Sequence, residues 1–233
     1  MEISTIGVVG LGTMGAGIAQ LCVQAGYETV GREISAELGE RGRDTIAHYL
    51  GRAVERERMT ADERDRALGR LSLTTDLREL APCDLVIEAI VEDLGAKREL
   101  FAELDGVVAP EAILATNTSA LPVTEIAAAT SRPERVLGMH FFNPAPVLRL
   151  VEVVRTERTG DEAFAAAVAF ARRLGKEPIA CNDTPGFVVN RILIPLLNDC
   201  VRVIDEARVS PEDVDRAMQF GANWPIGPCA LID

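Results

Sequence analysis

The N-terminal segment places the strongest constraint on how this chain can fold. Residues 3–9 are apolar and β-rich, and they lead directly into the motif G-L-G-T-M-G at residues 10–15. An apolar pattern with a period of 3.6 residues continues to Gly26, so the segment predicts a strand, a glycine turn and a helix. In such a unit the glycines form the turn, let backbone N–H groups approach a pyrophosphate, and let the helix pack closely on the strand. The residues predicted to bind a dinucleotide are Gly10, Gly12, Thr13, Met14 and Gly15.

An acidic residue follows the second predicted strand, at residues 28–32. Glu33 at this place would accept hydrogen bonds from a ribose 2′-hydroxyl and would repel a 2′-phosphate, which favours NAD over NADP as the cofactor. The neighbouring Arg32 leaves the alternative open, because an arginine here could accommodate a 2′-phosphate.

Strand and helix patterns alternate through most of the chain, which is typical of a doubly wound, mostly parallel sheet of the Rossmann type. The predicted strands cover residues 3–9, 28–32, 71–74, 84–89, 112–116, 135–142, 148–154 and 176–181, and the predicted helical regions cover 14–25, 35–70, 94–105 and 161–174. The strand at 148–154 is expected to be antiparallel to its predecessor.

The alternation stops at residues 182–186, and the sequence beyond Phe187 is helical in character. We therefore predict an NAD-binding Rossmann domain at residues 1–183, and the start of a smaller, all-helical C-terminal domain at residues 184–233. The chain ends at Ile232-Asp233 within an apolar stretch and without a capping residue. This suggests that the helical domain is truncated, and that the natural protein is longer and dimeric through this domain.

One of the two histidines of the chain is predicted to face a glutamate across a hairpin. Residues 135–142 and 148–154 have strand composition, and the segment Asn143-Pro144-Ala145-Pro146 between them must turn. Antiparallel pairing about a tight turn would place His140 opposite Glu152. A carboxylate against one imidazole nitrogen fixes the tautomer and stabilises the imidazolium, which leaves the other nitrogen to act as a general base. The alternative is a histidine that merely satisfies its hydrogen bonds at a strand end.

Composition narrows the class of protein. The formal net charge of −12 argues against a nucleic-acid partner, because a phosphate backbone would be repelled. The five cysteines form no C-x-x-C pair and no metal-binding spacing, so we expect reduced core thiols and no bound metal. The chain begins with a strand and not with a cleavable apolar segment, and no apolar run approaches the length of a membrane span. These features favour a cytoplasmic protein without membrane partners.

Several motifs in a fixed order resemble the L-3-hydroxyacyl-CoA dehydrogenase family, most closely its bacterial 3-hydroxybutyryl-CoA dehydrogenase branch. Besides the glycine motif, they are V-I-E-A-I-V-E at 86–92, T-N-T-S at 116–119, H-F-F-N-P at 140–144, L-V-E-V at 150–153 and D-T-P-G-F-V-V-N-R at 183–191. The resemblance implies NAD-dependent oxidation of the C3 hydroxyl of an (S)-3-hydroxyacyl-CoA to the ketone, or the reverse, in fatty acid or related acyl-CoA metabolism. It also implies a homodimer of the full-length protein.

The resemblance assigns roles to particular side chains. It implies that His140 is the catalytic base and Glu152 its partner, and that Ser119 and Asn190 hold the substrate oxygens. The residues implied to contact the nicotinamide half of NAD are Glu92, Lys97, Ser119 and Asn143.

Each of these side chains also has a simpler interpretation. Ser119 could cap a following helix, since serine after a strand is an ordinary N-cap. Glu88 and Glu92 could be ordinary carboxylates at the end of a strand, and Lys97 a solvated helix residue. Arg52 and Arg56, in the mixed-charge region 41–70, are candidates to bind the phosphates of CoA, although mixed charge is equally typical of a solvated face.

Two alternative functions remain at this level. A non-catalytic, crystallin-like relative could keep the fold and the NAD site without turnover, but it would have no need of the base His140. Another NAD(P) hydroxyacid dehydrogenase, such as the 6-phosphogluconate type, would use a lysine base, whereas this chain has the H-F-F-N-P motif.

Overall fold

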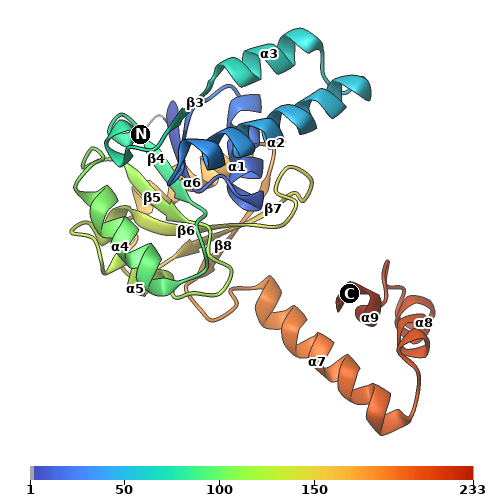
Figure 1. Cartoon of the computed structure of the whole chain (residues 1–233). Coiled ribbons are helices and arrows are strands. Elements are labelled where there is room, and N and C mark those ends of the chain that lie inside the picture. The colour runs from blue at the N-terminus through green and yellow to red at the C-terminus, as the bar shows by residue number, and fades with distance from the viewer. Residues whose placement is uncertain (1–2, 233) are drawn as a thin grey trace. The chain divides into compact units, whose positions relative to one another are not determined.

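The computed structural model describes residues 3–232 (Figure 1). The chain divides into two compact units, one that extends to Pro185 and one that begins at Gly186. Asp233, at which the sequence ends, lies outside the described residues. None of the helices within residues 3–232 has the length and apolar content that crossing a membrane requires.

The first unit is built on one eight-stranded sheet in the order β3-β2-β1-β4-β5-β6-β7-β8. In chain order the strands are β1 (Thr5–Val9), β2 (Glu28–Arg32), β3 (Leu71–Thr74), β4 (Leu85–Glu88), β5 (Ile113–Thr116), β6 (Val136–Phe141), β7 (Leu150–Arg155) and β8 (Glu177–Asn182). Among the strands of residues 3–232, only β6 and β7 pair antiparallel; β8 is again parallel to β7. The predicted Rossmann-type sheet with one antiparallel hairpin is therefore confirmed.

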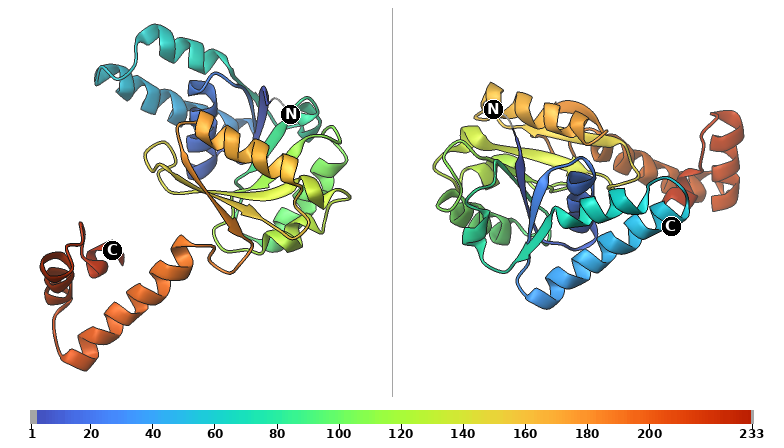
Figure 2. Two further views of the ribbon diagram at one scale, coloured as in Figure 1. Left: turned by 180° about the vertical axis from the view of Figure 1, so that it is seen from behind. Right: turned by 90° about the horizontal axis from the view of Figure 1, so that it is seen from above.

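Helices cover both faces of this sheet (Figure 2). They are α1 (Thr13–Gln24), α2 (Ala36–Glu55), α3 (Ala61–Gly69), η1 (Leu77–Leu80), α4 (Leu94–Asp105), α5 (Val123–Ala127), η2 (Pro133–Arg135) and α6 (Asp161–Arg173). Side chains of α1, α2 and α6 form one buried apolar cluster, and those of η1, α4 and α5 form another. The central strands β4, β5 and β6 are buried along their whole length, which explains why they appear in the sequence as continuous apolar runs.

Three local features differ from the sequence-based prediction. Residues 35–70 form two helices, because the chain turns at Glu57, which has φ 55°, and α3 then begins with a capping box of Thr60 and Glu63. The connection between β6 and β7 spans residues 142–149 and is longer than a tight turn. The short helices η1 and η2 were not predicted, and α5 was anticipated only as a helix that Ser119 could cap.

The second unit consists of α7 (Val189–Ala207), α8 (Pro211–Gly221) and α9 (Pro228–Ile232). Ser210 caps α8 by accepting a hydrogen bond from the Asp213 N–H. Asp215 on α8 accepts hydrogen bonds from the backbone N–H groups of Cys229 and Ala230, which ties α9 to α8. The second unit is therefore helical throughout, as predicted.

The cysteines only partly follow the prediction that they belong to the core. Cys22 and Cys83 are buried, whereas Cys181, Cys200 and Cys229 are half-buried, and all five are free thiols.

Candidate active site

Several of the predicted site residues in the first unit lie at one edge of the sheet. β1, β4, β5 and β6 run parallel, so their carboxyl ends lie at the same edge. The glycine motif follows β1, Glu92 follows β4 and Ser119 follows β5, while His140 is the last residue but one of β6. In open α/β sheets this is the edge at which ligands bind.

The glycine loop has the shape that a pyrophosphate requires. Gly10 has φ +87°, and a Cβ at Gly15 would lie 1.7 Å from the Gly10 carbonyl oxygen, so neither position accepts a side chain in this geometry. A Cβ added at Gly12 would have no atom within 4 Å, and Gly12 is the N-cap residue of α1. The loop therefore has room for the phosphates of NAD, at which the N-terminal N–H groups of α1 would be directed. Thr13 is exposed at this end, whereas Met14 packs against the core.

Glu33 lies beside this loop. Its carboxylate accepts hydrogen bonds from the backbone N–H groups of Leu11, at 2.6 Å, and Ile34, at 3.0 Å. Arg32, the residue that suggested NADP, is the last residue of β2, and its Nε is buried without a hydrogen-bond partner among residues 3–232.

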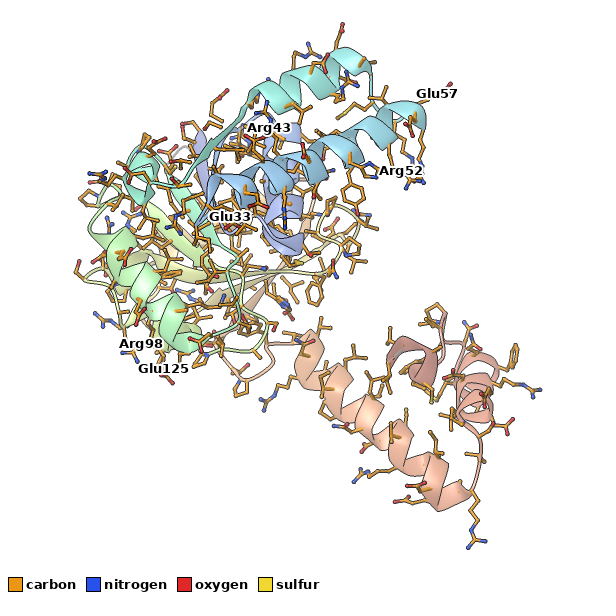
Figure 3. All side chains as sticks on the ribbon, viewed as in Figure 1. Glu33, Arg43, Arg52, Glu57, Arg98 and Glu125 are labelled. Atoms are coloured by element: carbon orange, nitrogen blue, oxygen red, sulfur yellow. The ribbon has the colours of Figure 1, made fainter. Side chains whose placement is uncertain are left out.

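A cavity of about 820 Å³ lies between α1, α2 and the loop that precedes β7. The predicted residues that line it are Gly12, Thr13, Glu33, Arg52, Arg56 and Asn143. It thus joins the predicted cofactor residues to the arginines predicted to bind CoA. Figure 3 shows Glu33 near the beginning of α2 and Arg52 further along the same helix. The predicted residues outside its lining are Gly10, Met14, Gly15, Glu92, Lys97, Ser119, His140, Glu152 and Asn190.

The loop that carries Asn143 is held by a buried lysine. The Lys176 ammonium donates to the carbonyl oxygens of Ala145, at 2.5 Å, and Leu148, at 2.8 Å. Burial lowers the pKa of Lys176. These two bonds fix the backbone of the loop that forms one wall of the cavity.

The hairpin brings His140 and Glu152 together as predicted. The two residues are direct partners in the β6–β7 register, and Nδ1 of His140 lies 2.7 Å from Oε2 of Glu152. An ionised carboxylate can only accept a hydrogen bond, so Nδ1 carries the proton and the lone pair of the neutral ring is on Nε2. Glu152 is fully buried and His140 is 6% exposed. The Phe142 ring packs against the imidazole at 4.4 Å between centroids.

Asn117 is a residue of the site to which no role was assigned from the sequence. Its side-chain oxygen accepts a hydrogen bond of 2.9 Å from the Phe141 N–H, next to His140. This bond joins the end of β5 to the end of β6. Its place directly after a buried parallel strand was the one signal that could have identified it.

Ser119 does not cap a helix. α5 begins at Val123, and its N-cap residue is Pro122, not Ser119. The Ser119 N–H and hydroxyl both donate to Oε1 of Glu92, at 2.7 and 3.1 Å. The N-cap interpretation is therefore wrong, because the carboxylate of Glu92 holds the serine instead.

Lys97 is not a solvated helix residue. Its side chain is fully buried, and its ammonium lies 2.5 Å from Glu88 and 3.3 Å from Glu92. Burial raises the pKa of Glu92, but the hydrogen bonds from Thr118 and Ser119 and the charge of Lys97 outweigh it, so the pKa lies below its usual value.

The last motif of the sequence divides between the two units. Asp183 accepts hydrogen bonds from the backbone N–H and the hydroxyl of Thr124, at 2.7 and 2.6 Å, and so fixes the start of α5. Asn190 is the second residue of α7, in the second unit.

The order of the sheet reverses between β1 and β4, and nucleotides bind at such a reversal. A histidine at the same edge, oriented by a carboxylate, can take the proton of a hydroxyl while hydride leaves the carbon. The fold and the site together define a Rossmann-type dehydrogenase. Residues 5–184 match the family model for the NAD-binding domain of 3-hydroxyacyl-CoA dehydrogenase, and residues 186–233 match the model for its C-terminal domain. The chain belongs to the 3-hydroxyacyl-CoA dehydrogenase family, and it is an NAD-dependent enzyme.

Individual relatives agree with this assignment. A 3-hydroxybutyryl-CoA dehydrogenase of Mycobacterium tuberculosis is 49% identical over 99% of this chain and 82% of its own length. A probable 3-hydroxybutyryl-CoA dehydrogenase of Deinococcus radiodurans is 46% identical, over 97% of this chain and 81% of that protein. The crystal structure of (S)-3-hydroxybutyryl-CoA dehydrogenase PaaH1 from Ralstonia eutropha matches 97% of this chain and 80% of its own, with a TM-score of 0.96 and 44% identity.

Proposed function

We propose that the chain oxidises the C3 hydroxyl of (S)-3-hydroxyacyl-CoA, with 3-hydroxybutyryl-CoA among its substrates, and that His140 is the general base. The contact of 2.7 Å between His140 and Glu152 carries this proposal. Nε2 of His140 accepts the proton of the C3 hydroxyl, and Glu152 stabilises the imidazolium that forms. NAD, when bound, supplies the acceptor for the hydride that leaves C3. In the reverse direction the imidazolium returns the proton to the ketone oxygen.

The remaining predicted residues bind and orient the reactants in this proposal. Ser119 and Asn190 hold the substrate oxygens, which supplies orientation to the reaction. The glycine loop binds the pyrophosphate of NAD and Glu33 the adenosine ribose. Glu92, Lys97, Ser119 and Asn143 form the surroundings of the nicotinamide. In this scheme residues 1–183 are the NAD-binding domain and residues 184–233 the start of the substrate and dimerisation domain.

The direct test is NADH oxidation with acetoacetyl-CoA. The absorbance of NADH at its long-wavelength maximum should fall when acetoacetyl-CoA is added, and 3-hydroxybutyryl-CoA of S configuration should be the product. Tight binding of NADH without turnover would instead support a non-catalytic relative, and turnover of free hydroxyacids but not of CoA esters would contradict the substrate class.

Arg52 and Arg56 are expected to bind the phosphates of CoA, because both line the cavity that reaches the glycine loop. Replacing both by glutamine should raise KM for acetoacetyl-CoA about thirtyfold, since each charge-assisted bond contributes on the order of 1 kcal/mol at an exposed site and each 1.4 kcal/mol is a factor of ten. KM for acetoacetyl-N-acetylcysteamine, which lacks the phosphates, should not change.

A matched control for these arginines is Arg98→Gln, because Arg98 lies on the outer surface of α4 (Figure 3). An equal rise in KM for both thioesters, or no rise for either, would contradict the role in phosphate binding.

We also propose that the protein is a cytoplasmic homodimer joined through the helical unit. No side chain of α7 is buried, although its apolar residues Ile192, Ile194 and Val201 are exposed, and Phe220 on α8 is 83% exposed. Apolar surface of this kind is typical of an interface between subunits. The free cysteines agree with a reducing compartment.

Native mass spectrometry should therefore show a dimer, and added salt should weaken it little because the surface is apolar. The double variant Val201→Glu, Phe220→Glu should shift the equilibrium to monomer, whereas Arg202→Gln, on the same helix, should not. A monomeric unmodified protein at micromolar concentration would refute this proposal.

A further inference from the structure

Three charged side chains meet at the N-terminal end of α4. Nζ of Lys97 lies 2.5 Å from Oε1 of Glu88 and 3.3 Å from Oε2 of Glu92. The side chains of Lys97 and Glu88 have no exposed surface, whereas that of Glu92 is 40% exposed. Two carboxylates thus share one ammonium, and of the three side chains only that of Glu92 reaches the surface.

The carboxylate of Glu88 is held by three hydrogen bonds. Glu88 is the last residue of β4, and its carboxylate accepts hydrogen bonds from the Thr116 hydroxyl and the Ile90 N–H, both at 2.7 Å, besides that from Lys97. A buried charge is tolerated only when it is paired and hydrogen-bonded, as this one is. The carboxylate therefore acts as a rigid anchor for the Lys97 ammonium.

Glu92 carries this arrangement to the loop after β5. While Oε2 faces Lys97, Oε1 accepts hydrogen bonds from the Thr118 hydroxyl at 2.6 Å and from the N–H and hydroxyl of Ser119. A continuous chain of charged and hydrogen-bonded groups thus leads from Glu88 in the core, through Lys97 and Glu92, to Ser119.

We propose that Glu88 is a positioning residue for the dehydrogenase reaction, which acts by sharing the Lys97 ammonium with Glu92 and thereby holding Ser119 in place. The charge balance gives the reason. When residue 88 is glutamine, Glu92 has the one carboxylate left beside the Lys97 ammonium. The attraction between Glu92 and Lys97 then draws Glu92 away from Ser119. The inference rests on the role in substrate binding proposed above for Ser119.

A double-mutant cycle tests this coupling. Glu88→Gln, Ser119→Ala and the double variant are compared by the rate of hydride transfer in a single turnover at saturating NADH. We expect Glu88→Gln alone to lower the rate about tenfold, and to lower it by less than twofold when Ser119 is already alanine, since residues that act through one another are not additive. A residue with a merely structural role would give the same factor in both backgrounds.

The opposite end of α4 provides a matched control. Asp105, the last residue of α4, forms another largely buried ion pair, at 2.7 Å, with Arg132, which precedes η2. Asp105→Asn should lower Tm, while any effect on the rate should be equal in the presence and absence of Ser119. Figure 1 shows α4 beside α5, on one side of the sheet.

Thr116 keeps the proposal testable if Glu88→Gln does not fold. Thr116→Val removes one hydrogen bond to Glu88 while it keeps the shape of the side chain. It should lower the rate of hydride transfer when residue 119 is serine but not when it is alanine. Thr116→Ser, which keeps the hydroxyl, should lower this rate less. Additive effects of Glu88 and Ser119 variants would overturn the inference alone. An unchanged rate in Ser119→Ala would overturn both the proposed role of Ser119 and the inference.

Discussion

His140→Gln is expected to lose a factor of roughly 10²–10⁴ in kcat, the range that general-base catalysis supplies, while NADH still binds. Glutamine can fill the place of the imidazole but cannot accept a proton from the C3 hydroxyl. Glu152→Gln should lose less, because the imidazole remains while its tautomer and its charge are no longer fixed by a carboxylate. Stopped-flow measurement of NADH oxidation, with NADH binding followed by fluorescence, gives both quantities.

His48 provides the control for this experiment. It is the other histidine of the chain, it lies on α2, and its ring contacts Tyr49 at 5.4 Å between centroids. His48→Gln should retain the kcat of the unmodified enzyme. Turnover near that of the unmodified enzyme in His140→Gln would show that another group is the base.

NADH is expected to exceed NADPH in kcat/KM by roughly 10²–10³, since placing like charges together costs several kcal/mol and each 1.4 kcal/mol is a factor of ten. The cause is the Glu33 carboxylate, which is held beside the glycine loop by the N–H groups of Leu11 and Ile34. A 2′-phosphate placed there would meet this negative charge and would find no donor on it. Glu33→Gln removes the charge and should narrow the ratio at least tenfold, mainly through weaker binding of NADH and stronger binding of NADPH.

Glu57→Gln is the appropriate comparison, because Glu57 lies at the far end of α2 (Figure 3). This variant should have the same ratio of kcat/KM for NADH to kcat/KM for NADPH as the unmodified enzyme. Equal kcat/KM for the two cofactors in the unmodified enzyme would mean that Arg32, and not Glu33, determines the choice.

The sheet could be predicted because its strands carry strong local signals. Buried parallel strands such as β4 and β5 are continuous apolar runs, and turn residues separate them from the helices. The register of the β6–β7 hairpin followed from the turn predicted at residues 143–146, since antiparallel pairing about that turn places His140 opposite Glu152. The break between α2 and α3 was less visible, since the polar residues on both sides give no change in pattern.

Apart from the pair of His140 and Glu152, the contacts that hold the site together could not be predicted from the sequence. The bond from Phe141 to Asn117 joins residues 24 apart, and that from Thr116 to Glu88 joins residues 28 apart. Such bonds depend on which strands are neighbours and not on any periodic pattern within a segment. Lys97 illustrates the point: its helix position alone suggested a solvated side chain, and only the packing of α4 on the sheet reveals the two carboxylates that pair with it.

The hydrogen bonds from Lys176 to the loop between β6 and β7 determine which parts of that loop can vary in sequence. Its ammonium binds carbonyl oxygens of the main chain and no side chain of the loop. The path of the backbone therefore does not depend on which side chains the exposed residues Val147 and Leu148 carry. Val147 lines the cavity, so substitutions there can reshape its wall while Asn143 stays where it is. The shape of this wall can thus vary while the backbone of the loop stays fixed.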